Sequence, residues 1–175
     1  MEGIGNPPVV TFELDDGTTL DACRRTLCQR SDVFSAMLEG SFSEAGKRRV
    51  KLHNTSVGGF KTLLCAAKGD VSLSEQKIES LLDAVLLADK YLMSEISEML
   101  TESSMSKLNH ENFYRAWVWA RSNHCHDLRS NCVKSFLTNK MSKAERVSAF
   151  HQFSSNDHFT EFLEDIQEAI TSNLV

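Results

Sequence analysis

The first fifty residues alternate between short apolar and short polar stretches, a pattern typical of strands joined by turns. Residues 9–14 are rich in β-branched side chains and partly alternate, and residues 19–22 resume this pattern after the turn-forming sequence Asp-Asp-Gly-Thr at 15–18. This order predicts a β-hairpin. At residues 49–53 apolar and charged side chains alternate again, which predicts a third strand. The sheet is therefore expected to be small.

Between these strands and after them, apolar side chains have the spacing of helices. Two short helices are predicted at residues 23–29 and 32–38, and a longer one at residues 57–67. Ser31 is placed to cap the second helix, and Thr55 or Ser56 to cap the third. The pair Gly58-Gly59 is expected to weaken the first turn of that third helix.

The remainder of the chain has the composition of stacked helices, because neither glycine nor proline follows Gly69. Ser72 and Glu75 have the spacing of a capping box, which predicts that a helix opens at Ser72 and continues through the apolar positions of residues 78–86. Helical spacing recurs at residues 96–100, 113–120, 128–136 and 159–170, separated by polar breaks at residues 101–107, 122–126 and 154–157. The whole pattern predicts an α+β module followed by a helical extension.

Composition narrows the classes of protein to which the chain can belong. Its 175 residues are 41% hydrophobic and 25% charged, which is ordinary for one globular domain with at most a small appendage. The 19 basic and 24 acidic residues give a net charge of −5, the wrong sign for a dedicated binder of nucleic acid or anionic membranes. No apolar run approaches the roughly 18 residues that a membrane span needs.

The amino terminus and the cysteines indicate a reducing compartment. Residues 1–10 have neither the basic region nor the apolar core of a secretory signal. The five cysteines are odd in number and irregularly spaced, and no two of them form a C-x-x-C pair. We therefore expect free thiols, in a protein of the cytoplasm, the nucleus or both.

The sequence contains no P-loop, dinucleotide-binding, G-x-S-x-G or H-E-x-x-H motif. His124-Cys125-His126 and the nearby Cys132 combine two residue types that bind zinc. Adjacent side chains point in different directions, however, so a polar turn followed by a helix-face cysteine is the favoured interpretation. A thiol nucleophile formed by Cys125 with His126 and Asp127 is a weaker hypothesis. We predict a protein that is not an enzyme and that binds no metal ion or cofactor.

Two tryptophans lie two positions apart and therefore cannot share one face of a helix. Trp117 continues the apolar spacing from Phe113 to Ala120 and is predicted to lie in the core. For Trp119, packing against the following helix is favoured, and an exposed aromatic that binds a partner is the alternative.

Residues 20–38, Leu-Asp-Ala-Cys-Arg-Arg-Thr-Leu-Cys-Gln-Arg-Ser-Asp-Val-Phe-Ser-Ala-Met-Leu, resemble the signature of BTB/POZ domains. The resemblance continues at residues 40–44, 49–53, 60–64 and 81–91, and residues 108–120 and 128–137 resemble the helix pair that begins a BACK region, including its three-box. It implies a flexible stretch at residues 1–8, a BTB/POZ fold at residues 9–104 and a helical three-box or partial BACK extension at residues 105–175.

Three departures from the family pattern bear on assembly. Cys23 stands where the family usually has histidine. Only eight residues precede Val9, where the family has a helix and a swapped strand that build the homodimer, so a weak or rearranged homodimer is expected. Residues 138–175 are shorter than a full BACK region, and no substrate-binding module is recognisable. A substrate protein is therefore expected to bind through a module outside this chain.

In cullin-3 adaptors of this family, an apolar-x-Glu motif after the second short helix binds the cullin, and Phe42-Ser43-Glu44 matches it in position and chemistry. An aromatic side chain can anchor an interface and a carboxylate can orient it. The resemblance implies that the cullin is bound by Met37, Leu38, Phe42, Ser43, Glu44, Asn112 and Trp119. It implies a non-catalytic adaptor of a cullin-3 ubiquitin ligase; the alternative is an oligomerisation scaffold that recruits corepressor or other partner proteins.

Overall fold

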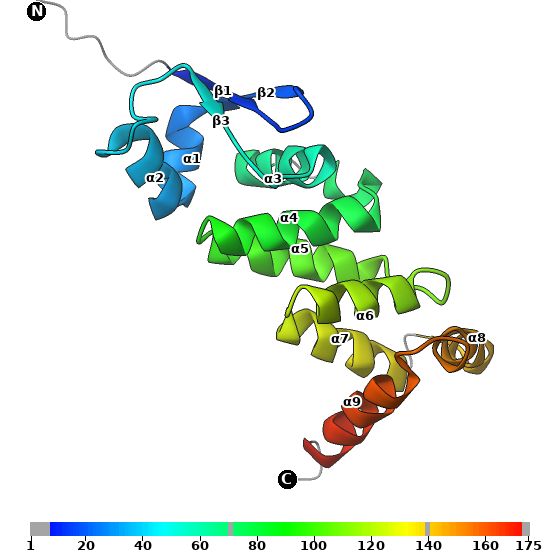
Figure 1. The fold of residues 1–175 in the computed structure, drawn as a ribbon. Coiled ribbons are helices and arrows are strands. Elements are labelled where there is room, and N and C mark those ends of the chain that lie inside the picture. Colours follow the sequence, from blue (N-terminus) through cyan, green and yellow to red (C-terminus); the bar gives the residue numbers. More distant parts are fainter. Residues whose placement is uncertain (1–7, 70–71, 139–140, 173–175) are drawn as a thin grey trace, which may run out of the picture. The chain divides into compact units, whose positions relative to one another are not determined.

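The structure is a computed structural model that describes residues 8–69, 72–138 and 141–172. Most of the predicted flexible stretch, residues 1–7, lies outside the described residues. The chain divides into two compact units, one that ends at Ser103 and one that begins at Ser104 (Figure 1).

The first unit contains a three-stranded sheet formed by β1 (Val9–Glu13), β2 (Thr19–Cys23) and β3 (Arg49–Lys51). β1 is central and pairs with β2 in antiparallel and with β3 in parallel orientation, which confirms the predicted hairpin and third strand. Phe12 of β1 lies opposite Val50 of β3, and both side chains are buried. The alternating pattern therefore places one face of this small sheet on the core.

α1 (Arg24–Arg30) and α2 (Asp32–Glu39) follow the hairpin. The Ser31 hydroxyl accepts a hydrogen bond from the Phe34 amide at 3.0 Å, which confirms Ser31 as the N-cap of α2. The same hydroxyl donates to the carbonyl of Tyr91 at 2.5 Å, and the Phe34 ring stacks on the Tyr91 ring with centroids 4.2 Å apart. These contacts join the start of α2 to residues about sixty positions later in the chain.

α3 (Val57–Lys68) and α4 (Ile78–Lys90) approach each other closely at one glycine. The Ser56 hydroxyl caps α3 by accepting from the Gly59 amide, and it donates to the Asp83 carboxylate of α4 at 2.7 Å. A Cβ atom on Gly59 would lie 2.6 Å from the Cβ atom of Asp83, which is closer than van der Waals contact allows. The Gly58-Gly59 pair was expected to weaken the helix, but at Gly59 the missing side chain is what lets the two helices touch.

We predict that Gly59→Ala destabilises the first unit by about 1–2 kcal/mol, because the added methyl group forces α3 and α4 apart. Gly58→Ala is the matched control: its added Cβ would meet only the end of the Ser80 side chain, which can rotate away. Urea denaturation followed by far-ultraviolet circular dichroism measures both variants. Equal stability of the two would show that the helices do not depend on the close approach at Gly59.

The expected helix start at Ser72 is wrong. Residues Ser72–Glu75 form a separate 3₁₀ turn, η1, and α4 begins only at Ile78, after Lys77, whose side chain makes no capping hydrogen bond. Leu73 within η1 is buried, and the Gln76 amide bonds to its carbonyl at 3.2 Å. Burial of Leu73 therefore holds this turn on the core, and the longer helix begins only after it.

The predicted polar break at residues 101–107 is also wrong, because α5 (Ser94–Ser106) continues through it. Ser104 and Met105 are buried within this segment, so its polar composition does not reflect exposure.

Within the described residues, the second unit contains the end of α5 and the helices α6 (Phe113–Ser122), α7 (His126–Leu137), α8 (Lys143–Ser154) and α9 (Phe159–Ser172). The turns between α6 and α7 and between α8 and α9 confirm the other two predicted breaks. α8 opens with a capping box between Ser142 and Glu145 that the sequence analysis did not single out. The α+β class with a helical extension is confirmed.

Aromatic side chains fill the core of the second unit. Trp117, Phe153 and Phe162 are fully buried, which confirms the prediction for Trp117. The rings of Phe153 and Phe162 stack with centroids 3.8 Å apart, and Trp117 packs edge-on against both. Three helices therefore meet at one aromatic cluster.

Candidate functional site

The loop that joins α2 to β3 carries the largest exposed aromatic side chain of the first unit. We refer to residues 40–48 as the Phe42 loop, in which the Phe42 side chain is 60% exposed. Two consecutive turns shape it: the Ala45 amide bonds to the Phe42 carbonyl at 3.0 Å, and the Lys47 amide bonds to the Glu44 carbonyl at 3.1 Å. Phe42 therefore projects from an ordered turn into solvent.

Two glycines allow the chain to enter and leave this turn. Gly40 ends α2, and a Cβ atom there would lie 2.3 Å from the carbonyl oxygen of Ala36. Gly46 has a φ of 72°, in the left-handed region that side chains disfavour. Its amide returns to the Leu38 carbonyl at 3.1 Å and closes the loop.

A buried arginine fixes both ends of the Phe42 loop. Arg24 is 2% exposed, and its guanidinium donates to the Leu38 carbonyl at 2.7 Å and to the Lys47 carbonyl at 2.6 Å. These carbonyls precede and follow the turn that presents Phe42. Hydrogen bonds from a charged donor are the stronger kind, so the loop is held in place independently of any partner.

The other predicted residues around Phe42 differ in their accessibility. Ser43 is exposed and Glu44 half-buried, so both reach the surface beside Phe42. Met37 is half-buried and packs against the core. Leu38 is fully buried, which corrects its assignment as a binding residue: its side chain belongs to the core, and its carbonyl anchors the loop.

Asn112 and Trp119, the two predicted cullin-binding residues of the second unit, both make contacts within that unit. The Asn112 side chain accepts from the Asn109 amide at 2.9 Å and donates to the Lys107 carbonyl at 2.9 Å, so both ends of its amide are engaged in the turn before α6. Trp119 is half-buried on α6, away from the core face that Trp117 occupies. A binding role for Trp119 stays a prediction.

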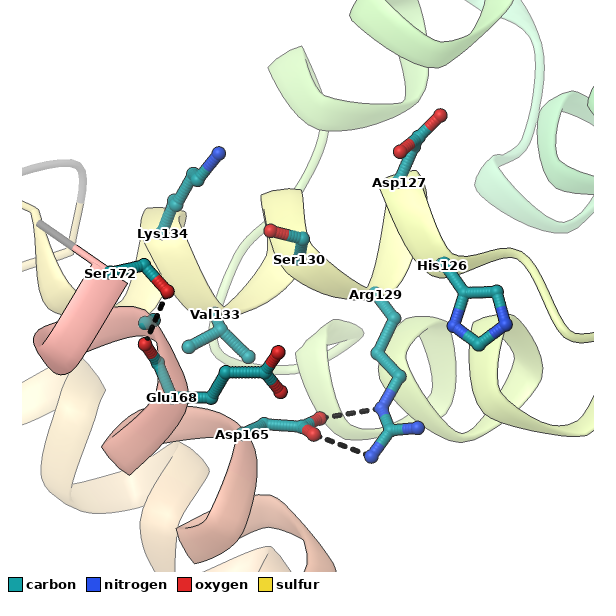
Figure 2. A pocket seen from close by; sticks show the side chains of 10 residues that line it. His126, Asp127, Arg129, Ser130, Val133, Lys134, Asp165, Glu168 and Ser172 are labelled. Atoms are coloured by element: carbon teal, nitrogen blue, oxygen red, sulfur yellow. Dashed lines mark hydrogen bonds and ion pairs between the residues drawn. The ribbon is translucent and has the colours of Figure 1, made fainter.

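A cavity of about 730 Å³ lies between α7 and α9. Figure 2 shows Arg129 and Asp165 directed at each other across it, and the Arg129 guanidinium donates to both Asp165 carboxylate oxygens, at 2.6 and 2.5 Å. Asp165 also accepts from the Trp117 indole at 2.9 Å. The side chains that line the cavity carry charges of both signs. The Arg129–Asp165 ion pair and the Trp117–Asp165 hydrogen bond hold α9 on α7 and α6.

The residues considered for zinc binding and for nucleophilic catalysis belong to the turn between α6 and α7. His124 adopts a left-handed φ of 56°, and the Cys125 amide bonds to the Ala120 carbonyl at 2.9 Å, which is the Schellman pattern at a helix end. His126 and Asp127 leave α7 in different directions (Figure 2). Within the three described ranges, no group of three or more metal-ligating side chains comes together.

The thiols differ in their ionisation. Hydrogen bonds from Thr26, first from its hydroxyl and then from its amide, lower the pKa of the exposed Cys23 thiol. Burial raises the pKa of Cys28 to about 11 and that of Cys132 to about 12. Because the thiolate is the reactive form, Cys23 combines the access and the ionisation that favour reaction.

We predict that iodoacetamide alkylates Cys23 before Cys28 and Cys132 in the folded protein at about pH 7.5. Peptide mass spectrometry over time measures the order. Thr26→Val should slow the reaction of Cys23, because the thiolate loses a hydrogen-bond donor, while alkylation in denaturant removes all differences. Faster labelling of Cys132 than of Cys23 would contradict the assigned environments.

None of the helices in the described ranges combines the length and apolar character needed to cross a membrane. A scan against protein-family models matches residues 9–108 to the BTB/POZ domain, which is more than half of the chain. BTB domains mediate partner binding and oligomerisation. The match spans the sheet, the helices packed on it and the Phe42 loop. The chain therefore belongs to the BTB/POZ family, with a BTB domain followed by a helical C-terminal region.

Proposed function

We propose that this protein is a non-catalytic adaptor that binds a cullin-3 scaffold through the Phe42 loop, in the cytoplasm, the nucleus or both. One observation carries the proposal: an aromatic side chain, 60% exposed, stands on a loop that a buried arginine holds at both ends. An exposed phenylalanine loses contact with water when a partner covers it, and aromatic anchors of this kind contribute much of the energy of an interface.

The order of the loop adds to the expected affinity. A loop that is flexible before binding loses conformational entropy when it docks, and a loop that is already fixed avoids most of that loss. Glu44, two residues from Phe42, offers a carboxylate that can accept a hydrogen bond and orient the partner, and Ser43 lies between them. The three residues together form the apolar-x-Glu motif expected of cullin-3 adaptors.

As an adaptor, the protein needs no catalytic side chain of its own. A substrate held beside a ubiquitin-charged enzyme experiences a raised effective concentration, which accelerates transfer by proximity. The substrate would bind through another module, and the BTB domain would supply the link to the cullin.

We predict that Phe42→Ala weakens binding to the cullin-3 amino-terminal domain by about 2 kcal/mol, or roughly thirtyfold in Kd, because the interface loses its anchor. Isothermal titration calorimetry with the whole chain measures this change. Glu44→Gln should weaken binding less, because the amide oxygen can still accept a hydrogen bond.

Ser41→Ala is the matched control, since Ser41 is exposed in the same loop and lies outside the motif. Circular dichroism checks that all three variants remain folded. Absence of binding by the unchanged protein, or equal Kd values for Phe42→Ala and Ser41→Ala, would refute the proposed cullin interface.

A further inference from the structure

The strand β3 forms one edge of the three-stranded sheet (Figure 1). β1 pairs with it on one side, and among the residues that the structure describes no strand pairs with it on the other. An unpaired edge presents backbone donors and acceptors to solvent, and these can pair with another extended chain. β3 is therefore a candidate site for the addition of a fourth strand.

The register of β3 shows which of its backbone groups are unused. The carbonyl of Arg48 and the amide of Leu52 both bond to β1, at 2.8 and 2.9 Å. In a parallel pair, alternate residues of a strand turn their backbone groups toward the same neighbour. Val50 therefore faces β1 as well, and Arg49 and Lys51 face away from it. In the described part of the chain, no hydrogen bond uses the backbone amide or carbonyl of Arg49 or Lys51.

The open edge is basic. Lys47, Arg48, Arg49 and Lys51 are all exposed. Arg49 forms an ion pair with Glu13 at 3.4 Å, whereas the other three take part in no ion pair within the described ranges. Like charges on neighbouring strands repel and opposite charges attract, so this edge disfavours β3 of a second copy and favours an acidic strand. Charge complementarity thus identifies the kind of chain that fits the edge.

We propose that an acidic, extended segment of a partner protein pairs with the outer edge of β3. The free amide and carbonyl groups of Arg49 and Lys51 supply the main-chain hydrogen bonds. The side chains of these two residues share one face of the sheet, so every second side chain of the added strand lies beside them. Carboxylates fit those positions, and β-branched apolar side chains fit the intervening positions on the face of Val50.

This interaction goes beyond the proposed binding of cullin-3. It uses the backbone and the charges of β3, whereas the cullin is proposed to bind the exposed Phe42 side chain. β3 has only three residues, so the pairing is expected to be weak, and salt should weaken it further because the charges are exposed. Phe42→Ala is expected to leave this pairing unchanged.

Peptides of defined charge test the proposal with the whole chain. The probe is a short fluorescein-labelled peptide of alternating glutamate and valine, capped at both ends. A second peptide has lysine in place of glutamate. A third keeps the glutamates but carries N-methyl groups on its backbone, which remove main-chain donors and leave the charges. Fluorescence anisotropy at low salt is expected to show saturable binding of the first peptide and much weaker binding of the other two.

Two substitutions at one position separate backbone pairing from charge. Lys51→Pro removes an amide that faces away from β1, so the pairing of β1 with β3 survives, as is usual for proline on a strand edge. Lys51→Gln is the matched control, because it loses the same charge and keeps the amide. The Kd for the acidic peptide should be about tenfold higher for Lys51→Pro than for Lys51→Gln, as expected when one hydrogen bond is lost.

Hydrogen exchange supplies an independent measurement, since the acidic peptide should slow exchange of the Arg49 and Lys51 amides. Absence of saturable binding by the unchanged protein would overturn the proposal. So would equal binding of the acidic peptide and its N-methylated form, or equal Kd values for the two folded Lys51 variants, because the contact would then depend on charge alone. Circular dichroism checks the fold, and if Lys51→Pro is unfolded the N-methylated peptide decides with the unchanged protein.

Discussion

Replacing Asp165 by alanine is expected to lower the free energy of unfolding of the second unit by about 3 kcal/mol. The Asp165 side chain is only 12% exposed and accepts hydrogen bonds from the Arg129 guanidinium and the Trp117 indole. Without it, the indole N–H of a fully buried tryptophan has no partner, and the charge of Arg129 is left uncompensated in a partly buried position. The contact also joins three helices, so its loss affects the whole unit.

Tryptophan fluorescence can follow this unfolding selectively, because both tryptophans of the chain, Trp117 and Trp119, lie on α6. Urea denaturation of Asp165→Ala should therefore show an earlier fluorescence transition. Glu164→Ala is the control: Glu164 is the exposed neighbour of Asp165, and its removal should change stability by no more than about 0.5 kcal/mol. Equal stability of the two variants would show that the Asp165 contacts contribute nothing net.

Replacing Arg24 by methionine is expected to destabilise the first unit by about 2–3 kcal/mol. Methionine fills a similar space but donates no hydrogen bond, so the carbonyls of Leu38 and Lys47 lose the guanidinium that ties them together. The Phe42 loop then becomes mobile. Binding of the cullin-3 domain should weaken further than the loss of stability explains, because the loop must be ordered on docking.

Hydrogen exchange of the loop amides, followed by mass spectrometry, separates these effects. Faster exchange is expected for the Ala45 and Gly46 amides in Arg24→Met, while tryptophan fluorescence of the second unit stays unchanged. Arg25→Met is the matched control, since Arg25 is the exposed neighbour on α1. Protection of the loop in Arg24→Met equal to that in Arg25→Met would mean that the loop keeps its shape without the buried arginine.

Local signals predicted much of the fold. Apolar alternation identified all three strands, and the hydroxyl of Ser31 caps α2 as its position indicated. The same kind of signal failed at Ser72, where burial of Leu73 held a short turn instead, and it was present but overlooked at Ser142. The spacing of serine and glutamate therefore does not by itself fix where a long helix begins, because the packing of neighbouring apolar side chains also decides it.

The candidate site was only partly predictable. Its motif was located through the resemblance to BTB/POZ domains, because Phe42, Ser43 and Glu44 match a motif of that family in position and chemistry. The role of Arg24 could not be predicted, because a basic residue on a short helix is ordinarily solvated. Only the folded chain brings its guanidinium to the carbonyls of Leu38 and Lys47. Burial of Leu38 likewise depends on what packs beneath α2.

The contacts between Tyr91 and the start of α2 bear on when the first unit can fold during synthesis. The Ser31 hydroxyl and the Phe34 ring find their partners only once residue 91 has been made, and β3 must also have been made to pair with β1. A nascent chain that ends before residue 91 therefore lacks the ring that stacks on Phe34 and the carbonyl that Ser31 binds. Completion of the BTB core waits for α4, so a pause in translation before Tyr91 would prolong exposure of that apolar surface to chaperones.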